Sequence, residues 1–148
     1  MMKTVFDKTT REEITGRINS LDETSVAQWG KMNVDQVIKH CSMFDEMVLG
    51  RQTYKRVFIG LVIGKIALKN LLKNEKPLGK SLPTFLDTSA TESEGIAAAK
   101  RKWIGLVEEY AGFSNTNFVH PFFGKMTKDQ IGYFVYKHTD HHLRQFNS

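Results

Sequence analysis

The chain has 148 residues, 41% hydrophobic and 25% charged, the proportions of a folded globular protein, and we expect residues 1–148 to form one domain. Its net charge of +5 is accompanied by no helix-turn-helix, RNP-like or zinc-finger pattern, so we expect no nucleic-acid partner. The single cysteine, Cys41, excludes an internal disulfide framework and, with an N-terminus that lacks an apolar signal region, predicts a cytoplasmic location.

Apolar residues recur at helical spacing along most of the chain, and the first two helices are predicted over residues 10–21 and 33–49. Each opens with a capping-box pair, an N-cap side chain followed three residues later by Glu or Gln: Thr10 with Glu13, and Asn33 with Gln36. The apolar face of the second helix includes Cys41, which we interpret as a small core residue rather than a nucleophile.

A third helix is predicted over residues 57–72, and it is apolar almost all round. Gly60 and Gly64 form a small-xxx-small pair, which is typical of close helix contacts. The run contains Lys65 and Lys69 and is shorter than the roughly 20 apolar residues that a membrane span needs. We therefore expect a buried or dimer-forming helix and no membrane span, with its lysines forming a solvated flank.

Two long loops, residues 74–90 and 112–126, precede the fourth and the last helix. Both of these helices open with capping-box pairs: Thr91 with Glu94, and Thr127 with Gln130. No segment alternates clearly between apolar and polar residues, so no strand is predicted. The sequence predicts an all-α fold.

Three of the five histidines lie near the C-terminus, and two of them, His138 and His142, continue an apolar stripe of the last helix. Side chains four residues apart on a helix are about 5–6 Å apart at Cβ, so both imidazoles can reach one metal ion. His40 lies at the edge of the apolar face of the second helix and is the best third ligand. Three neutral imidazoles suit Zn²⁺, Ni²⁺ or Fe²⁺ and leave a position for water or substrate.

The same histidines have simpler interpretations. Imidazoles near a helix C-terminus interact favourably with its dipole, and a core histidine such as His40 is often a packing residue. An open metal site, in contrast, can lower the pKa of bound water to roughly 7 and so support catalysis. Spacing alone does not decide between these interpretations.

Other polar residues near the cluster are candidates for supporting or catalytic roles. His141 is one residue off the stripe and is expected either next to the ligands, supporting them, or at the rim of the site. His120 precedes a proline and is a fourth ligand, a general acid or base, or a turn residue, of which the turn is the simplest. Arg144 and Gln145 could bind an anionic or amide group or could simply be solvated at the helix end, whereas Asp140 is expected too near the outer face to be a ligand.

The arrangement of His40 in the second helix and a terminal helix with His138-x-x-x-His142 and Arg144-Gln145 resembles the DinB/YfiT-like superfamily. Further stretches resemble, more specifically, a bacterial branch of it that is a domain of unknown function: Trp29-Gly30-Lys31-Met32, residues 120–127 and residues 141–146. The resemblance covers nearly the whole chain.

This resemblance implies an up-down-down-up four-helix bundle, here with an extra apolar helix and two long loops, often a homodimer. It also implies that His40, His138 and His142 hold a divalent metal. Characterised members include S-transferases and isomerases that use low-molecular-weight thiols, metal-dependent hydrolases, and damage-inducible proteins without an established activity. The chain departs from many members in having Arg144 where glycine is frequent, and in its apolar segment 57–72.

Three functional hypotheses follow. The leading one is a metal-dependent enzyme, either a thiol-dependent S-transferase or a hydrolase, whose ion is a Lewis acid. The second is a non-catalytic dimeric bundle with a structural metal or a stress-related role. The third, and least favoured, is a basic helix that binds lipid or nucleic acid in a salt-dependent manner.

Overall fold

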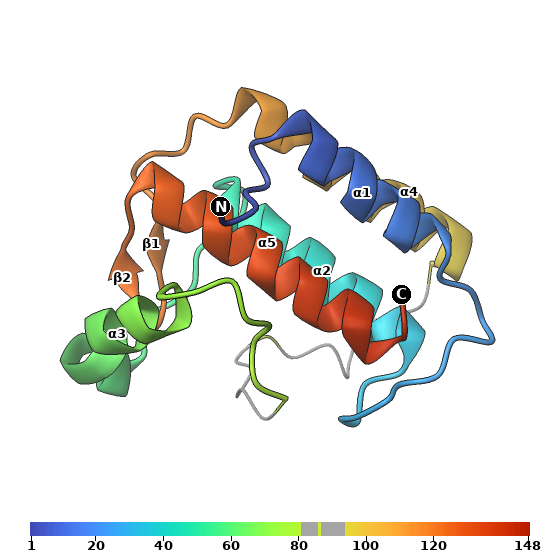
Figure 1. Ribbon diagram of the computed structural model, residues 1–148, viewed down its shortest axis with the longest axis horizontal. Coiled ribbons are helices and arrows are strands. Elements are labelled where there is room, and N and C mark those ends of the chain that lie inside the picture. Colours follow the sequence, from blue (N-terminus) through green and yellow to red (C-terminus); the bar gives the residue numbers. More distant parts are fainter. Residues whose placement is uncertain (81–85, 87–93) are drawn as a thin grey trace.

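The computed structural model describes residues 1–80, 86 and 94–148, and these residues are mostly helical (Figure 1). The elements in chain order are helices and one pair of short strands: α1 (Lys8–Asn19), α2 (Val34–Val48), α3 (Phe58–Leu71), α4 (Ile96–Glu109), the 3₁₀ turn η1 (Tyr110–Gly112), β1 (Val119–His120), β2 (Gly124–Lys125) and α5 (Lys128–Gln145). The helical content confirms the all-α prediction.

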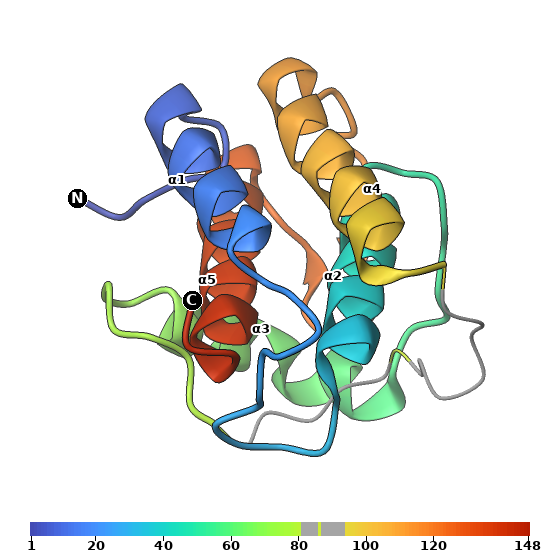
Figure 2. The same cartoon turned by 90° about the vertical axis from the view of Figure 1, so that its right-hand side faces the viewer.

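Four of the helices lie side by side, and α3 is apart from them (Figures 1 and 2). α4 contacts α1 and α2, and α5 also contacts α1 and α2, so these four helices enclose a common core. Each of the four contributes large, fully buried side chains, among them Ile14, Ile38, Trp103 and Leu143, and Tyr110 of η1 is buried with them. α3 instead packs against the short hairpin formed by β1 and β2.

The helix starts agree with the sequence in two cases. α2 and α5 begin with complete capping boxes at Asn33 and Thr127, as predicted. α1 begins before Thr10, with Asp7 as N-cap, so the predicted cap at Thr10 is wrong. Arg11 explains the earlier start, because its Nη1 donates to the carbonyls of Val5 and Phe6 and holds the chain that enters the helix.

α4 begins later than the sequence suggested. Its N-cap is Gly95, with φ 86°, a conformation that favours glycine. Glu94 precedes this cap, outside the helix, and its predicted partner Thr91 lies outside the described residues. At the other end the helix tightens into η1, which finishes at Gly112, the first residue of the predicted loop 112–126.

Of the two alternatives expected for α3, a buried or a dimer-forming helix, the buried one is wrong. Only Gly60, Gly64 and Leu68 are buried along it. The two glycines lie against the backbone of Phe122, since a Cβ at either position would come within 2.3 Å of the Phe122 carbonyl oxygen. The small-xxx-small pair therefore makes a contact within the chain. None of the helices in the described part of the chain has the length and apolarity to cross a bilayer.

A hairpin that the sequence did not predict lies within the loop 112–126. Val119 pairs with Lys125 and His120 with Gly124 in an antiparallel ladder. Gly124 has φ +78° and permits the reversal, and two-residue strands are too short to show alternation.

Candidate metal centre

Three imidazoles converge between α2 and α5. His40 comes from the middle of α2, and His138 and His142 come from successive turns of α5. The Nε2 atoms of His40 and His138 are 3.2 Å apart, and one nitrogen from each of the three residues lies within 4.8 Å of the other two. The structure thus brings together the three residues that the sequence suggested as ligands.

The donor set fits a transition-metal ion. Two nitrogens bound at 2.0–2.1 Å to a tetrahedral ion are about 3.3 Å apart, close to the separation of the His40 and His138 nitrogens. The group contains three imidazoles and no carboxylate. Such a set favours Zn²⁺, Ni²⁺ or Fe²⁺ over Mg²⁺ or Ca²⁺, which prefer oxygen ligands.

Burial keeps all three imidazoles in the form that binds metals. Loss of solvent, with the nearby His141, lowers the pKa of His40 to about 4. Burial also lowers the pKa of His142 to about 3, with His40 contributing. The pKa of His138 falls well below its ordinary value for the same reasons. At neutral pH each ring therefore has a lone pair available, as coordination requires.

Gln145 fixes the orientation of His142. Its Oε1 lies 2.9 Å from Nδ1 of His142, and its Nε2 donates to the carbonyl of Trp29 at 2.9 Å. An amide oxygen can only accept, so Nδ1 of His142 holds the proton and Nε2 keeps its lone pair. Gly30, with φ +79°, allows this close approach, because a Cβ there would lie 2.7 Å from Nε2 of Gln145. The spacing of three residues from His142 was the signal for this role, which the sequence analysis missed.

The other two imidazoles are held by packing and by the contact between their Nε2 atoms. Nδ1 of His40 and Nδ1 of His138 are buried, and no described residue offers either a hydrogen-bond partner. Phe44 stacks on His138 with ring centroids 3.8 Å apart. These two rings have four nitrogens, and the polar contact between them joins only the two Nε2 atoms. Most buried polar atoms in native proteins have a hydrogen-bond partner, so this pair is under-satisfied.

His120 is buried near this cluster and has a defined role in the hairpin. Its Nδ1 accepts from the backbone amides of Phe122 and Phe123 at 3.0 and 3.1 Å. Burial, together with Arg56, lowers its pKa to about 3. The structure shows the turn contact that was the simplest of the three interpretations.

His141 and Trp29 border the cluster. The His141 ring lies 5.5 Å from Trp29 and 5.0 Å from the His142 ring. Burial lowers the pKa of His141, and a hydrogen bond with the Leu78 backbone partly opposes this shift. His141 is 8% exposed, so of its two expected positions it has the one next to the ligands rather than the one at the rim.

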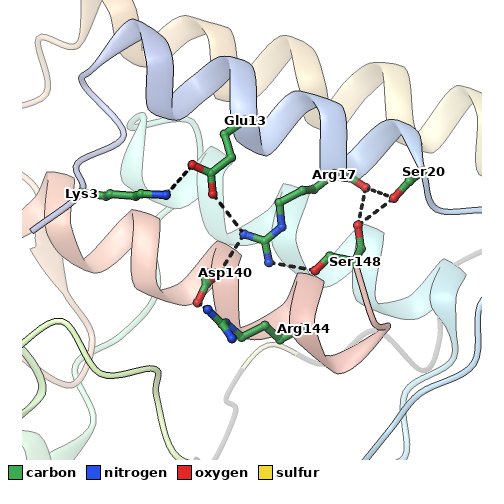
Figure 3. A network of polar contacts seen from close by, with 7 residues as sticks. All are labelled: Lys3, Glu13, Arg17, Ser20, Asp140, Arg144 and Ser148. Atoms are coloured by element: carbon green, nitrogen blue, oxygen red, sulfur yellow. Dashed lines mark hydrogen bonds and ion pairs between the residues drawn. The ribbon is translucent and has the colours of Figure 1, made fainter.

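Arg144 belongs to a network that ties α5 to α1 (Figure 3). Asp140 accepts from Nη1 of Arg17 and from Nε of Arg144, both at 2.8 Å. Arg17 also donates to the Ser148 carbonyl at 2.9 Å. Asp140 is only 5% exposed because Arg17 covers it, so its predicted position near the outer face is wrong.

The model of the family DUF1569, described as a protein of unknown function, matches residues 3–148. The chain belongs to this family. No curated protein and no solved structure matches it. The DUF1569 family carries no described activity, so the functional argument depends on the geometry of the site.

A second buried polar group of this DUF1569 chain lies on the same helix as His40. Asp45 is 1% exposed and accepts from Nε1 of Trp103 at 3.0 Å and from the hydroxyl of Tyr110 at 2.7 Å. Burial raises the pKa of Asp45 to about 7, while these two hydrogen bonds oppose the rise. The sequence analysis did not identify it. A cavity of about 320 Å³ lies nearby between α2 and α4, and the three histidines do not line it.

Proposed function

We propose that this DUF1569 chain binds one divalent metal ion through His40, His138 and His142 and is a metal-dependent enzyme. The observation that supports this most strongly is the convergence of three neutral imidazoles, with two nitrogens 3.2 Å apart. The ion is Zn²⁺, Ni²⁺ or Fe²⁺, which imidazoles bind well.

The chemistry is either thiol-dependent S-transfer or hydrolysis. A divalent ion held by these three neutral ligands would supply Lewis acidity to a water or a thiol. His40, His138 and His142 provide the ligands, and Gln145 holds His142 in the tautomer that leaves Nε2 free to bind. In the S-transferase version a low-molecular-weight thiol is the cosubstrate.

The helix arrangement is consistent with a DinB/YfiT-like up-down-down-up bundle, which we propose as the fold. In support, α1, α2, α4 and α5 each contact two of the other three. A single domain over residues 1–148 and a homodimer belong to the same proposal. Light scattering of the purified chain gives its mass in solution and tests the homodimer.

A structural metal is the alternative, and burial favours it. His40 is 4% exposed and His142 is 8% exposed, and the cavity between α2 and α4 does not reach them. An ion enclosed in this way would stabilise α2 against α5 without meeting a substrate.

Turnover measurements separate these possibilities. The chain is loaded with each ion and assayed with a thiol plus an aromatic electrophile, and with an activated ester without thiol, beside a His40→Ala variant. Turnover that needs thiol assigns S-transfer, and turnover without thiol assigns hydrolysis. Retained metal, no turnover in either assay, and a lower melting temperature in His40→Ala would instead assign a structural ion.

A further inference from the structure

The outward side of α3 is an exposed apolar surface. Its buried side consists of Gly60, Gly64 and Leu68, so most of its large side chains point away from the molecule. Six of them form what we call the α3 face, with exposed fractions of 42–80%: Phe58, Ile59, Leu61, Val62, Ile63 and Ile66. Contiguous apolar surface of this kind in a folded protein marks an interaction site.

The chain segment that contains this face is rich in basic residues. The segment 51–80 contains eight of the 21 Lys and Arg residues and one of the 16 Asp and Glu residues, so it carries +7 while the rest of the chain carries −2. All eight basic residues are exposed. The one acid, Glu75, pairs with the N-terminal amine. None of the six lysines of this segment has an acidic partner among the described residues: Lys55, Lys65, Lys69, Lys73, Lys76 and Lys80.

The position of α3 leaves this face accessible. Figure 1 shows α3 at one end of the molecule, with the four core helices and the hairpin on its inner side. Its two glycines lie against Phe122, and Nζ of Lys137 donates to the Leu71 carbonyl at 2.6 Å. Contacts on the inner side therefore hold the helix, and its outer side can bind a surface without disturbing the core.

We propose that the α3 face binds the surface of an anionic lipid bilayer. A helix with exposed Phe, Ile, Leu and Val beside Lys and Arg is typical of helices that lie in the membrane interface. The apolar side chains would enter the boundary between headgroups and acyl chains, and the lysines would contact lipid phosphates.

Charge decides between a bilayer and a second copy of the chain. In a two-fold dimer the same surface meets itself, so two segments of +7 would face each other. An anionic bilayer offers both an apolar layer and the opposite charge. This inference is independent of the metal site.

Co-sedimentation with lipid vesicles tests the proposal. The full chain should bind vesicles of phosphatidylcholine with phosphatidylglycerol at least about tenfold more tightly than phosphatidylcholine alone, and more weakly as salt increases. Val62→Asp/Ile66→Asp should lower the affinity by about a hundredfold. Lys69→Gln/Lys73→Gln should lower it by roughly 25-fold, about fivefold per lysine. Val26→Asp, at an exposed valine outside the α3 face, is the matched control and should change nothing.

Two outcomes would overturn the proposal. One is that folded wild-type protein binds neither vesicle type, or binds both with equal affinity. Circular dichroism checks that the protein is folded. The other is a dimer that Val62→Asp/Ile66→Asp converts to monomer while vesicles remain unbound, which would assign the α3 face to a second copy. Metal content measured on the same variants should equal that of wild type, which separates this test from the test of the metal site.

Discussion

Two buried polar side chains lie five residues apart on α2 and have opposite surroundings. Asp45 lies beside α4, where Trp103 and Tyr110 each donate a hydrogen bond to it. His40 lies beside α5, where its Nδ1 and that of His138 have no partner among the described residues. Both groups are almost completely enclosed, yet the protein satisfies only the first.

This difference indicates what each group is for. A buried polar atom destabilises a fold unless it is hydrogen-bonded, so native structures satisfy nearly all of them. The Asp45 group joins α2 to α4 and needs no ligand. In His40 and His138 the Nε2 atoms contact only each other and the Nδ1 atoms have no partner among the described residues. A metal ion between the two Nε2 atoms would give them the ligand that protein contacts do not supply.

The largest effect should come from removing the satisfied group. Asp45→Ala leaves the Trp103 N–H and the Tyr110 hydroxyl buried without an acceptor, so we expect the free energy of unfolding to fall by about 4 kcal/mol. Urea unfolding measures this. Asp45→Asn keeps the shape and one acceptor and is the control, with a loss of about half that size. A loss below about 1 kcal/mol in Asp45→Ala would show that the group is not structural.

Lowering the pH should change the contributions of His40 and Asp45 to the free energy of unfolding in opposite directions. In the metal-free protein the folded pKa of His40 is about 4, below its ordinary 6.5. The unfolded chain therefore binds a proton first, and the free energy of unfolding falls as pH drops from 6.5 towards 4. The folded pKa of Asp45 is about 7, above its ordinary 3.8, so its contribution falls as pH rises from 3.8 to 7.

A variant isolates the histidine part of this profile. His40→Leu should remove a loss of about 3 kcal/mol between pH 6.5 and pH 4, measured by urea unfolding across that range. Asp45→Asn should instead remove the decrease in the free energy of unfolding that Asp45 causes as the pH rises from 3.8 to 7. A His40→Leu profile parallel to that of wild type would contradict the burial of a neutral imidazole.

Gln145 should affect metal affinity through the orientation of His142. Gln145→Leu removes the acceptor for Nδ1 of His142, and loss of such a contact typically weakens metal binding 10–100-fold, about 2 kcal/mol. Competition with a chromophoric chelator measures the affinity. Arg144→Leu is the neighbouring control, because Arg144 pairs with Asp140 and contacts none of the three ligands. Equal affinities in the two variants would contradict the orienting role.

The smallest effect on the free energy of unfolding should come from replacing His138 in the metal-free protein. His138→Leu loses one contact with His40 and keeps an apolar side chain against Phe44, so we expect the free energy of unfolding to change by no more than about 1 kcal/mol. Thermal and urea unfolding of the metal-free protein check this. A loss as large as that of Asp45→Ala would mean that the imidazoles are structural.

Local patterns predicted much of this molecule. The capping boxes at Asn33 and Thr127 depend on neighbouring residues only, and both are present. The helical spacing of His138 and His142 is also local, and it correctly brought the pair to one face. The pairing of these residues with His40, about a hundred positions earlier, depended on the face that His40 occupies and on a family resemblance.

The remaining features depend on contacts that are distant in sequence. Apolar composition is the same for a buried helix and for an exposed binding surface, so the exposure of α3 was not predictable. Asp45 gives no signal until Trp103 and Tyr110 are placed against it. The burial of Asp140 depends on tertiary contacts, among them the pairing with Arg17 of α1.

Metal content of untagged protein, measured by plasma mass spectrometry beside a His138→Ala/His142→Ala variant, tests the central claim most directly. We predict near-stoichiometric Zn, Ni or Fe in the wild type and its loss in the variant, with Asp45→Asn retaining the wild-type content. Absence of metal from the wild type, even after each ion is added back, would contradict the metal site and leave the three histidines as a packing cluster.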